Sequence, residues 1–418
     1  MIKFSNARNQ ISSIKKNQFL SGSLVMVLGF NLSNFGQALY HFIFARLLGK
    51  VYYGDLATII TIAGIIGVIQ MSFGLTIVRQ IASSKSESKS SNFIKWIFLW
   101  SIIIGLAIGI VTEILAPFLS GFLKISQPEA VYLLGPLLFF FFIANSNRSI
   151  LQGLLKFKSF VLSLITETFS KVLITLILVS LGFKLFGAMI GFLISIILSC
   201  LVTIYAIRSY IKGKRDKPPA IGPLFKYSGA VLLQGLALTS MYSTDLLLVK
   251  HFLTPLQAGL YASMAIMGRI VFFGTTPITN VMFPMVAKKH SNNESYHKIF
   301  YLSLLLVVSV ALLITLFYFL LPKIAIMLLV GPEYFDGAAI LWWFGISMTL
   351  LSLAMLLTQF FLSIGHTKVV SLFVMAAILQ IILIWFNHQA LLTVIQMSII
   401  SVSLLDLCLF VYFLRRVR

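Results

Sequence analysis

Ionisable side chains that interrupt long apolar runs are the residues of this sequence best suited to chemistry. Arg269 and Asp245 lie in such runs, as do Lys171, Glu113 and Asp406. A charge at the centre of a bilayer costs about 2.5–3.5 kcal/mol on insertion scales, so such a group faces a partner or a watery cavity. In a cavity, a base can bind phosphate or carboxylate, and an acid can exchange a proton or a cation.

Two of the bases have open alternatives. Arg269 has no acid within one helical turn, so it either faces a cavity or pairs across to Asp245 on the preceding apolar segment. Lys171 follows Glu167 by four residues, the favourable order for an i,i+4 pair. It is therefore either neutralised within its own helix or turned toward a cavity.

Two further bases lie near the predicted helix ends, where long side chains reach the membrane interface. Arg46 is one of them. Arg148 is the other, and it forms a polar cluster with Asn145 and Asn147 just before it. Arg148 serves either as a positively charged anchor or as part of a binding site.

Polar residues also mark the first apolar segment. Asn34 and Gln37 are three residues apart and share a helix face, which Asn31 extends. Such a stripe points to the interior of a helix bundle. It either lines a path or joins helices by hydrogen bonds.

Three acids are candidates for binding and exchanging a coupling ion, either a proton or sodium. Glu113 and Asp406 are isolated in apolar segments, and Asp245 is the acid nearest to Arg269 along the apolar runs. Glu113 and Asp406 can equally be protonated and hydrogen-bonded within a bundle.

Signatures of common enzyme sites are missing from the sequence. It has no G-x-x-x-x-G-K-[ST] phosphate loop and no H-E-x-x-H motif, and its six histidines show no ligand spacing. Cys200 and Cys408 lie in apolar runs and predict no disulfide framework. We expect neither catalytic residues nor a metal or cofactor.

Composition places the chain in a membrane. Of its 418 residues, 59% are hydrophobic and only 10% are charged, and the mean hydropathy is +1.01. A soluble domain carries about a quarter charged residues. The net charge of +21 could suggest nucleic acid, but the bases lie mostly in short loops, which is the orientation signal of an inserted protein. We expect membrane lipids and no nucleic acid as partners.

The apolar runs predict an all-α membrane protein, because about 20 apolar residues span a bilayer. The twelve predicted spans are 21–45, 55–78, 93–119, 130–152, 160–182, 184–208, 223–249, 258–284, 298–320, 337–362, 368–387 and 390–413. A thirteenth apolar piece, 322–330, is too short to cross. With the N-terminus in the cytoplasm, 24 of the 32 lysines and arginines fall in cytoplasmic segments and 6 in outer segments. This bias predicts that both termini are cytoplasmic.

A basic stretch from Lys212 to Pro219 divides the chain near its middle. We therefore predict two six-helix lobes, residues 1–217 with the linker and residues 218–418. A hairpin around Ala45–Ala57 resembles one around Thr254–Gly259, at an offset that places Gly54 on Gly259. Transporters are often built from two such halves, with the substrate path between them.

Several motifs together resemble the oligosaccharide or polysaccharide flippases of the Wzx type. These belong to one superfamily with the multidrug exporters called MATE and the lipid II flippases. The resemblance is carried by Ala45–Gly49 with Tyr53-Gly54, by Gly153–Phe157, by Asp245 with Gly259, Tyr261 and Pro284, and by Gly331–Tyr334. It covers nearly the whole chain and implies a MATE-like fold.

The resemblance implies a flippase for an undecaprenyl-diphosphate-linked oligosaccharide, acting by alternating access in the bacterial inner membrane to build a surface polysaccharide such as O-antigen. Its diphosphate would need bases, for which Arg269, Arg148, Lys171 and Arg46 are the candidates; Asn34 and Gln37 could meet the sugar. The alternatives are a cation-coupled multidrug exporter or a lipid II flippase of the same fold, and a membrane glycosyltransferase or polymerase.

Overall fold

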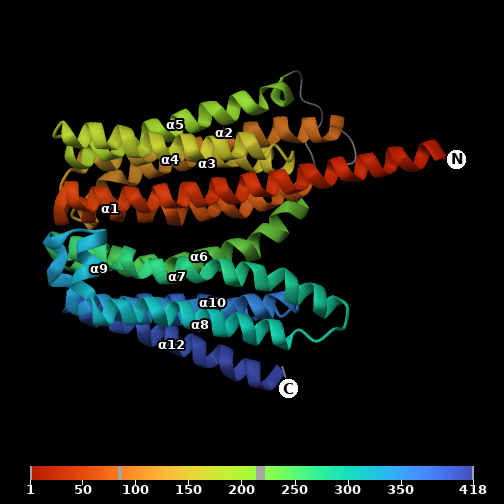
Figure 1. Ribbon diagram of the computed structural model, residues 1–418. Helices are drawn as coiled ribbons and strands as arrows, with labels where there is room; N and C mark the ends of the chain where they lie inside the picture. The colour runs from red at the N-terminus through yellow and green to blue at the C-terminus, as the bar shows by residue number, and fades with distance from the viewer. Residues whose placement is uncertain (1, 83–86, 213–221, 417–418) are drawn as a thin grey trace. The chain divides into compact units, whose positions relative to one another are not determined.

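The computed structural model describes residues 2–82, 87–212 and 222–416, and this part of the chain is helical and contains no strand. Figure 1 shows its long helices. The elements are α1 (Ile2–Ala82), α2 (Glu87–Phe122), the 3-10 helix η1 (Pro128–Leu133), α3 (Leu134–Gly153), α4 (Phe157–Ser180), α5 (Lys184–Ile211), α6 (Gly222–Phe252), α7 (Pro255–Ser291), α8 (His297–Leu320), α9 (Pro322–Leu329), the 3-10 helix η2 (Pro332–Gly337), α10 (Ala338–Ser363), α11 (Val369–Phe386) and α12 (Leu391–Arg416).

Eleven described helical ranges are long and apolar enough to cross a membrane. The first of them, Leu28–Ala82, has 55 residues. At 1.5 Å per residue it would be about 80 Å long, far more than the roughly 30 Å of a bilayer core. Gly49 interrupts it with φ 68° and ψ 174°, a conformation that glycine adopts without strain. The break separates the spans predicted at 21–45 and 55–78.

Two short elements precede α10. Helix α9 has eight residues and is about 12 Å long, so it cannot cross a bilayer, as its apolar stretch predicted. Gly331, with φ 104°, then turns the chain into η2, which begins at Pro332. These elements connect α8 to α10.

The predicted elbow at Thr254–Gly259 is the start of α7. The Thr254 hydroxyl accepts a hydrogen bond from the Gln257 backbone N–H, and the Gln257 side chain bonds back to the Thr254 backbone. Pro255 occupies the first helical turn, where its missing N–H costs nothing. The local sequence therefore ends α6 and begins α7 at this point.

Unit 1 is the first of two compact units and consists of Met1–Tyr40, Ile69–Pro117 and Glu129–Ser228. Helices α3, α4 and α5 pack side by side in it (Figure 1). The α4–α5 contact is close: a Cβ on Gly191 would lie 2.8 Å from the Thr175 Cα. One apolar cluster of unit 1 is formed by Ile77, Ile81, Phe93, Ile94, Ile150, Leu151, Phe160, Val161 and Ile207.

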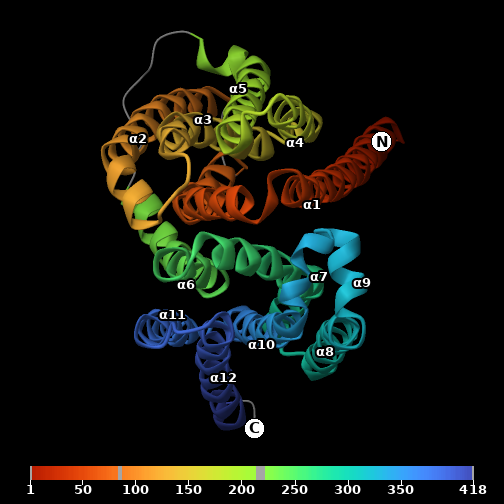
Figure 2. The same ribbon diagram turned by 90° about the vertical axis from the view of Figure 1, so that its left-hand side faces the viewer.

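Unit 2 consists of His41–Val68, Phe118–Pro128 and Gly229–Arg418. Its central helix is α10, which contacts α7, α8, α11 and α12 (Figure 2). Unit 2 thus includes two segments of the predicted N-terminal lobe. The predicted boundary at 217/218 and the linker after Lys212 lie outside the described residues, so the two six-helix lobes stay a prediction.

Candidate functional site

The nine predicted site residues divide between the two units. Unit 1 holds Asn34, Gln37, Glu113, Arg148 and Lys171, and unit 2 holds Arg46, Asp245, Arg269 and Asp406. The described residues include no group of three or more His, Cys, Asp or Glu side chains that could hold a metal ion.

Arg148 is buried in unit 1, and its donors are heavily engaged. Its Nε donates to the Ser163 hydroxyl at 2.9 Å, and Nη2 donates to the Ser163 carbonyl at 3.1 Å. The same Nη2 lies 2.5 Å from Glu167 Oε2 and 2.6 Å from the Ser199 hydroxyl. Nη1 donates to Asn145 Oδ1 at 3.2 Å. Arg148 therefore joins α3, α4 and α5 and is not an anchor that reaches the interface.

Lys171 does not form the predicted direct ion pair with Glu167, whose carboxylate is taken by Arg148. Its Nζ donates instead to Gln37 Oε1 on α1. The ammonium also lies 4.3 Å from the Tyr40 ring centroid and 4.8 Å from that of Phe192. Aromatic faces attract cations electrostatically. The structure thus brings two predicted residues, Gln37 and Lys171, together in a buried cage.

The polar stripe of α1 divides in the structure. Asn31 and Asn34 are exposed, whereas Ser33 is buried and its hydroxyl lies 2.7 Å from that of Thr168 on α4. Gln37 is half-buried on the same helix. One part of the stripe therefore joins helices, and Asn34 stays available at the surface.

Glu113 lies on α2 against Gly135, which is in the first turn of α3. A Cβ on Gly135 would be 2.5 Å from Glu113 Oε2, so only glycine leaves room for this carboxyl group. Within the described chain, Oε2 is buried and has no hydrogen-bond partner. The environment of Glu113 is thus that of an isolated acid.

In unit 2, Asp245 and Arg269 lie on the neighbouring helices α6 and α7 but make no direct ion pair. Asp245 is 2% exposed and accepts hydrogen bonds from the Tyr261 hydroxyl at 2.7 Å and the Leu246 backbone N–H at 2.8 Å. Arg269 Nε donates to the Tyr242 carbonyl at 3.1 Å, and its guanidinium lies 5.4 Å from the Tyr242 ring centroid. Arg269 is therefore anchored by the backbone carbonyl and the ring of one residue, Tyr242.

One end of the Arg269 guanidinium is uncommitted. Its Nη2 is buried and has no hydrogen-bond partner among the described residues. An unmade hydrogen bond of a buried charged donor costs free energy, so this atom is suited to an incoming acceptor. The predicted alternative in which Arg269 is neutralised by direct contact with Asp245 does not occur here.

Asp406 and Arg46 are the remaining predicted residues of unit 2. Both carboxyl oxygens of Asp406, on α12, are buried without a partner in the described part of the chain. Arg46 Nη2 donates to the carbonyls of Met327 and Leu328, each at 2.7 Å. Arg46 thus satisfies carbonyls at the end of α9, which have no partner within that helix.

A buried ion pair between Asp55 and Lys250 was not predicted from the sequence. Both side chains are 0% exposed, and Asp55 Oδ2 also accepts the Ser126 backbone N–H at 2.9 Å. Lys250 lies at a predicted helix end, where its charge was counted as an orientation signal. The sequence offered one hint. An acid, Asp55, lies in the first of the two similar hairpins, and a base, Lys250, lies just before the elbow of the second.

The eleven long apolar helical ranges of the described chain, with charged side chains buried among them, are those of a multi-pass membrane protein. Comparisons with known proteins identify its family. The family described as "Polysaccharide biosynthesis protein" matches residues 43–339. The chain belongs to this family. It is 24% identical over 281 residues to the uncharacterized membrane protein MJ1375 of Methanocaldococcus jannaschii, covering 63% of this chain and 67% of that protein.

The fold is similar to those of several solved structures, of which two are described here. A multidrug resistance MATE family transporter of the MOP superfamily, in its inward-facing conformation, matches with a TM-score of 0.76 at 14% identity, over 90% of this chain and 93% of that one. The lipid II flippase MurJ, in an inward closed conformation, matches with a TM-score of 0.75 at 15% identity. The match covers 93% of this chain and 87% of that one. The predicted MATE-like fold is confirmed. The flippase activity that the sequence motifs imply stays a prediction.

Proposed function

We propose that this protein is a flippase that moves a lipid-linked oligosaccharide, carried on undecaprenyl diphosphate, across the bacterial inner membrane for surface polysaccharide synthesis. It does so by alternating access between two six-helix lobes, with both termini in the cytoplasm. The family membership supports a role in polysaccharide biosynthesis. Transport without chemistry on the cargo agrees with the flippases and transporters that share the fold.

The observation that carries the proposal is the free end of Arg269. Its Nε is fixed on the Tyr242 carbonyl, while the buried Nη2 has no partner in the described chain. A guanidinium held in this way has donors in a fixed geometry for phosphate oxygens. Arg269 binds the diphosphate in this proposal, and the ring of Tyr242 holds the guanidinium in place.

Residues of unit 1 have different roles in the proposal. Lys171, held by Gln37 and two aromatic rings, supplies positive charge, and Asn34 is exposed and can meet the sugar. Arg148 does not contact the cargo in this proposal, because its hydrogen bonds are already made to Ser163, Glu167 and Ser199. It holds α3, α4 and α5 together. Arg46 holds the end of α9 and contributes through its charge.

A cation-coupled multidrug exporter is the second candidate. It is favoured by the carboxyl groups of Asp406 and Glu113, which have buried oxygens without hydrogen-bond partners in the described chain. Such groups bind protons or cations. In the leading proposal the same acids, with Asp245, couple transport to a proton or sodium gradient.

Deleting the gene and extracting the lipid-linked sugars from the membrane tests the proposal. We expect a lipid-linked oligosaccharide to accumulate on the cytoplasmic face while the surface glycan is lost, and its mass identifies the cargo. An unchanged lipid-linked pool with a rise in intracellular toxic cations supports the exporter instead. A missing or incomplete lipid-linked unit indicates a role in synthesis and overturns both transport proposals.

A further inference from the structure

Arg269 begins a stripe of residues on one face of α7. Phe273, Thr276 and Asn280 lie four, seven and eleven residues after it, so the four residues of this Arg269 stripe share a helix face. Phe273 is 55% exposed, Asn280 is exposed and Thr276 is half-buried. At 1.5 Å per residue, Phe273 lies about 6 Å and Asn280 about 16 Å beyond Arg269 along the helix axis. The stripe therefore continues the face that carries the proposed diphosphate contact.

The ring of Tyr242 on α6 links Phe273 to Arg269. Its centroid lies 5.4 Å from the guanidinium carbon of Arg269 and 6.1 Å from the centroid of the Phe273 ring. The Tyr242 and Phe273 rings meet at an interplanar angle of 69°, an edge-to-face arrangement. Phe273 is thus one ring away from the guanidinium, and about half of its surface stays open to whatever lies outside the helix.

Helix α8 shows how a lipid-facing surface of this unit differs from the Arg269 stripe. From Leu312 to Leu320, every exposed residue of α8 is apolar, and Phe319 among them is 56% exposed. The Arg269 stripe instead carries a guanidinium, a hydroxyl and an amide, which lipid tails cannot solvate. Phe273, equally exposed but within the polar stripe, therefore faces water or a polar cargo.

Pro277 deprives the Phe273 carbonyl of its helical hydrogen bond. It lies inside α7, four residues after Phe273, and has no N–H to donate. The nearby hydroxyls of Thr275 and Thr276 donate to the Phe272 carbonyl instead, at 2.9 Å and 2.8 Å. The Phe273 carbonyl is therefore suited to accept a hydrogen bond from a hydroxyl group outside the helix, on the same residue that exposes its ring.

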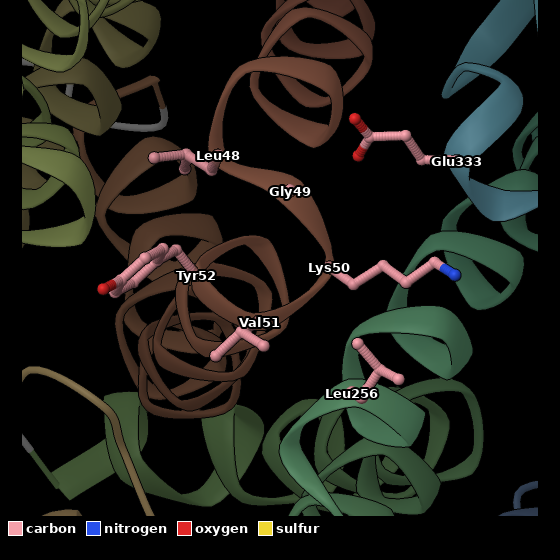
Figure 3. A pocket seen from close by; sticks show the side chains of 7 residues that line it. All are labelled: Leu48, Gly49, Lys50, Val51, Tyr52, Leu256 and Glu333. Carbon is pink, nitrogen blue, oxygen red and sulfur yellow. The ribbon is translucent and has the colours of Figure 1, made fainter.

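A pocket of about 430 Å³ at the Gly49 turn is the other polar hollow of unit 2 that an anionic cargo could meet. Figure 3 shows the Glu333 carboxylate directed toward this turn. The lysine that lines the pocket, Lys50, is already paired with Asp336 at 2.7 Å. The Glu333 carboxylate repels a diphosphate, so this pocket is poorly suited to one. The Arg269 stripe, which carries a base and no acid, is better suited.

We propose that Phe273 is the platform for the sugar bonded directly to the diphosphate, and that the Phe273 carbonyl accepts a hydroxyl of that sugar. This inference rests on the proposed function, in which Arg269 binds the diphosphate. A sugar ring presents C–H groups on its faces, and the negative face of an aromatic ring attracts them. Phe273 thereby distinguishes the glycosylated carrier lipid from the bare one, a choice that a guanidinium bound to phosphate cannot make.

Binding of two lipids to the full chain in nanodiscs separates the sugar contact from the diphosphate contact. One probe is undecaprenyl diphosphate, and the other is undecaprenyl diphosphate that carries a single N-acetylglucosamine. Native mass spectrometry gives the dissociation constant of each. We expect the parent protein to bind the glycosylated probe about fivefold to tenfold more tightly than the bare one, because only the glycosylated probe reaches the aromatic ring.

Phe273→Ala should abolish this preference and leave the affinity for undecaprenyl diphosphate unchanged, which also shows that the variant is folded. Phe273→Tyr should keep the preference because the ring remains, whereas Phe273→Leu should lose it because only apolar surface remains. Arg269→Ala should weaken the binding of both probes. Phe319→Ala is the matched control, since Phe319 is equally exposed on the apolar face of α8, and both affinities should stay as in the parent.

A preference that survives in Phe273→Ala or Phe273→Leu overturns the inference. So does a Phe273→Ala variant that binds both probes equally more weakly than the parent, because the ring would then contact the lipid tail or support the helix. Equal affinity of the parent for the two probes overturns it as well. In each of these cases the parent still binds the carrier lipid, so the proposed function stands. If the parent binds neither probe, the proposed function fails and this inference fails with it.

Discussion

Gly54 and Gly259 occupy equivalent positions in the two similar hairpins, and in the structure their backbones touch. A Cβ on Gly54 would lie 2.7 Å from the Gly259 Cα, and a Cβ on Gly259 would lie 1.8 Å from the Lys50 carbonyl oxygen. Equivalent positions of a two-fold repeat meet only near its axis. The contact therefore supports the internal repeat at the offset that the sequence suggested.

Gly259→Ala should destabilise the protein, because the added methyl group overlaps the Lys50 carbonyl and the backbone must move. Overpacking of this kind costs about 1–3 kcal/mol or more. Thermal unfolding in detergent measures the loss. Gly64→Ala is the matched control. Gly64 lies on α1 in the same unit, and a Cβ there would meet no atom within 4 Å beyond its chain neighbours and the adjacent backbone of its own helix. That variant should be neutral or slightly stabilising, and an equal loss in both would contradict the close contact.

Glu167→Gln should destabilise unit 1 by about 3–5 kcal/mol, because it leaves the buried Arg148 guanidinium without its counter-charge. Thermal unfolding again provides the measurement. Glu294→Gln is the control, because Glu294 and Lys289 form an exposed pair and its loss should not be measurable. The double variant Arg148→Met with Glu167→Met should recover much of the stability. A Glu167→Gln variant as stable as the parent would show that the ion pair is not needed.

Arg269→Ala should abolish transport while the protein still inserts and accumulates normally, because the free guanidinium donor is the proposed contact to the diphosphate. Arg269→Lys keeps the charge but loses the planar fork, so it should retain part of the activity. Transport of lipid-linked oligosaccharide in reconstituted vesicles gives the readout. Wild-type rates for Arg269→Ala would remove this residue from the proposed site.

Asp406→Asn and Glu113→Gln test which acid couples transport to an ion gradient. Each carboxyl group has buried oxygens without hydrogen-bond partners in the described chain, so each can bind a proton or cation. We expect at least one variant to transport equally fast with and without an imposed proton or sodium gradient. If the gradient dependence of both matches the parent, neither acid is the coupling site.

Much of the fold follows from local sequence patterns. Hydropathy predicts the spans because each helix must hide its backbone from lipid independently of its neighbours. The elbow at Thr254 is similarly local, since its cap and Pro255 lie within four residues. The short α9 could also be predicted, because its length alone excludes a crossing.

The pairing of charged residues could not be predicted in this way. Glu167 was expected to neutralise Lys171 one turn later, but the structure pairs it with Arg148 on another helix. The base that pairs with Glu167 depends on how α3, α4 and α5 are rotated about their axes relative to one another. That rotation is set by packing at positions such as Gly191, where α4 and α5 approach closely. Asp55 and Lys250 were missed for the same reason, because the partners are far apart along the chain.

That separation has a consequence for how the protein is made. Asp55 is buried against a lysine that leaves the ribosome roughly 200 residues later, which takes about 10–40 s at ordinary rates of synthesis. During this interval the first hairpin is in the membrane region with an unmatched carboxylate. The packing of this hairpin against α6 is therefore a late step of assembly. Truncation of the nascent chain before Lys250 should leave the hairpin accessible to membrane-insertion factors and proteases.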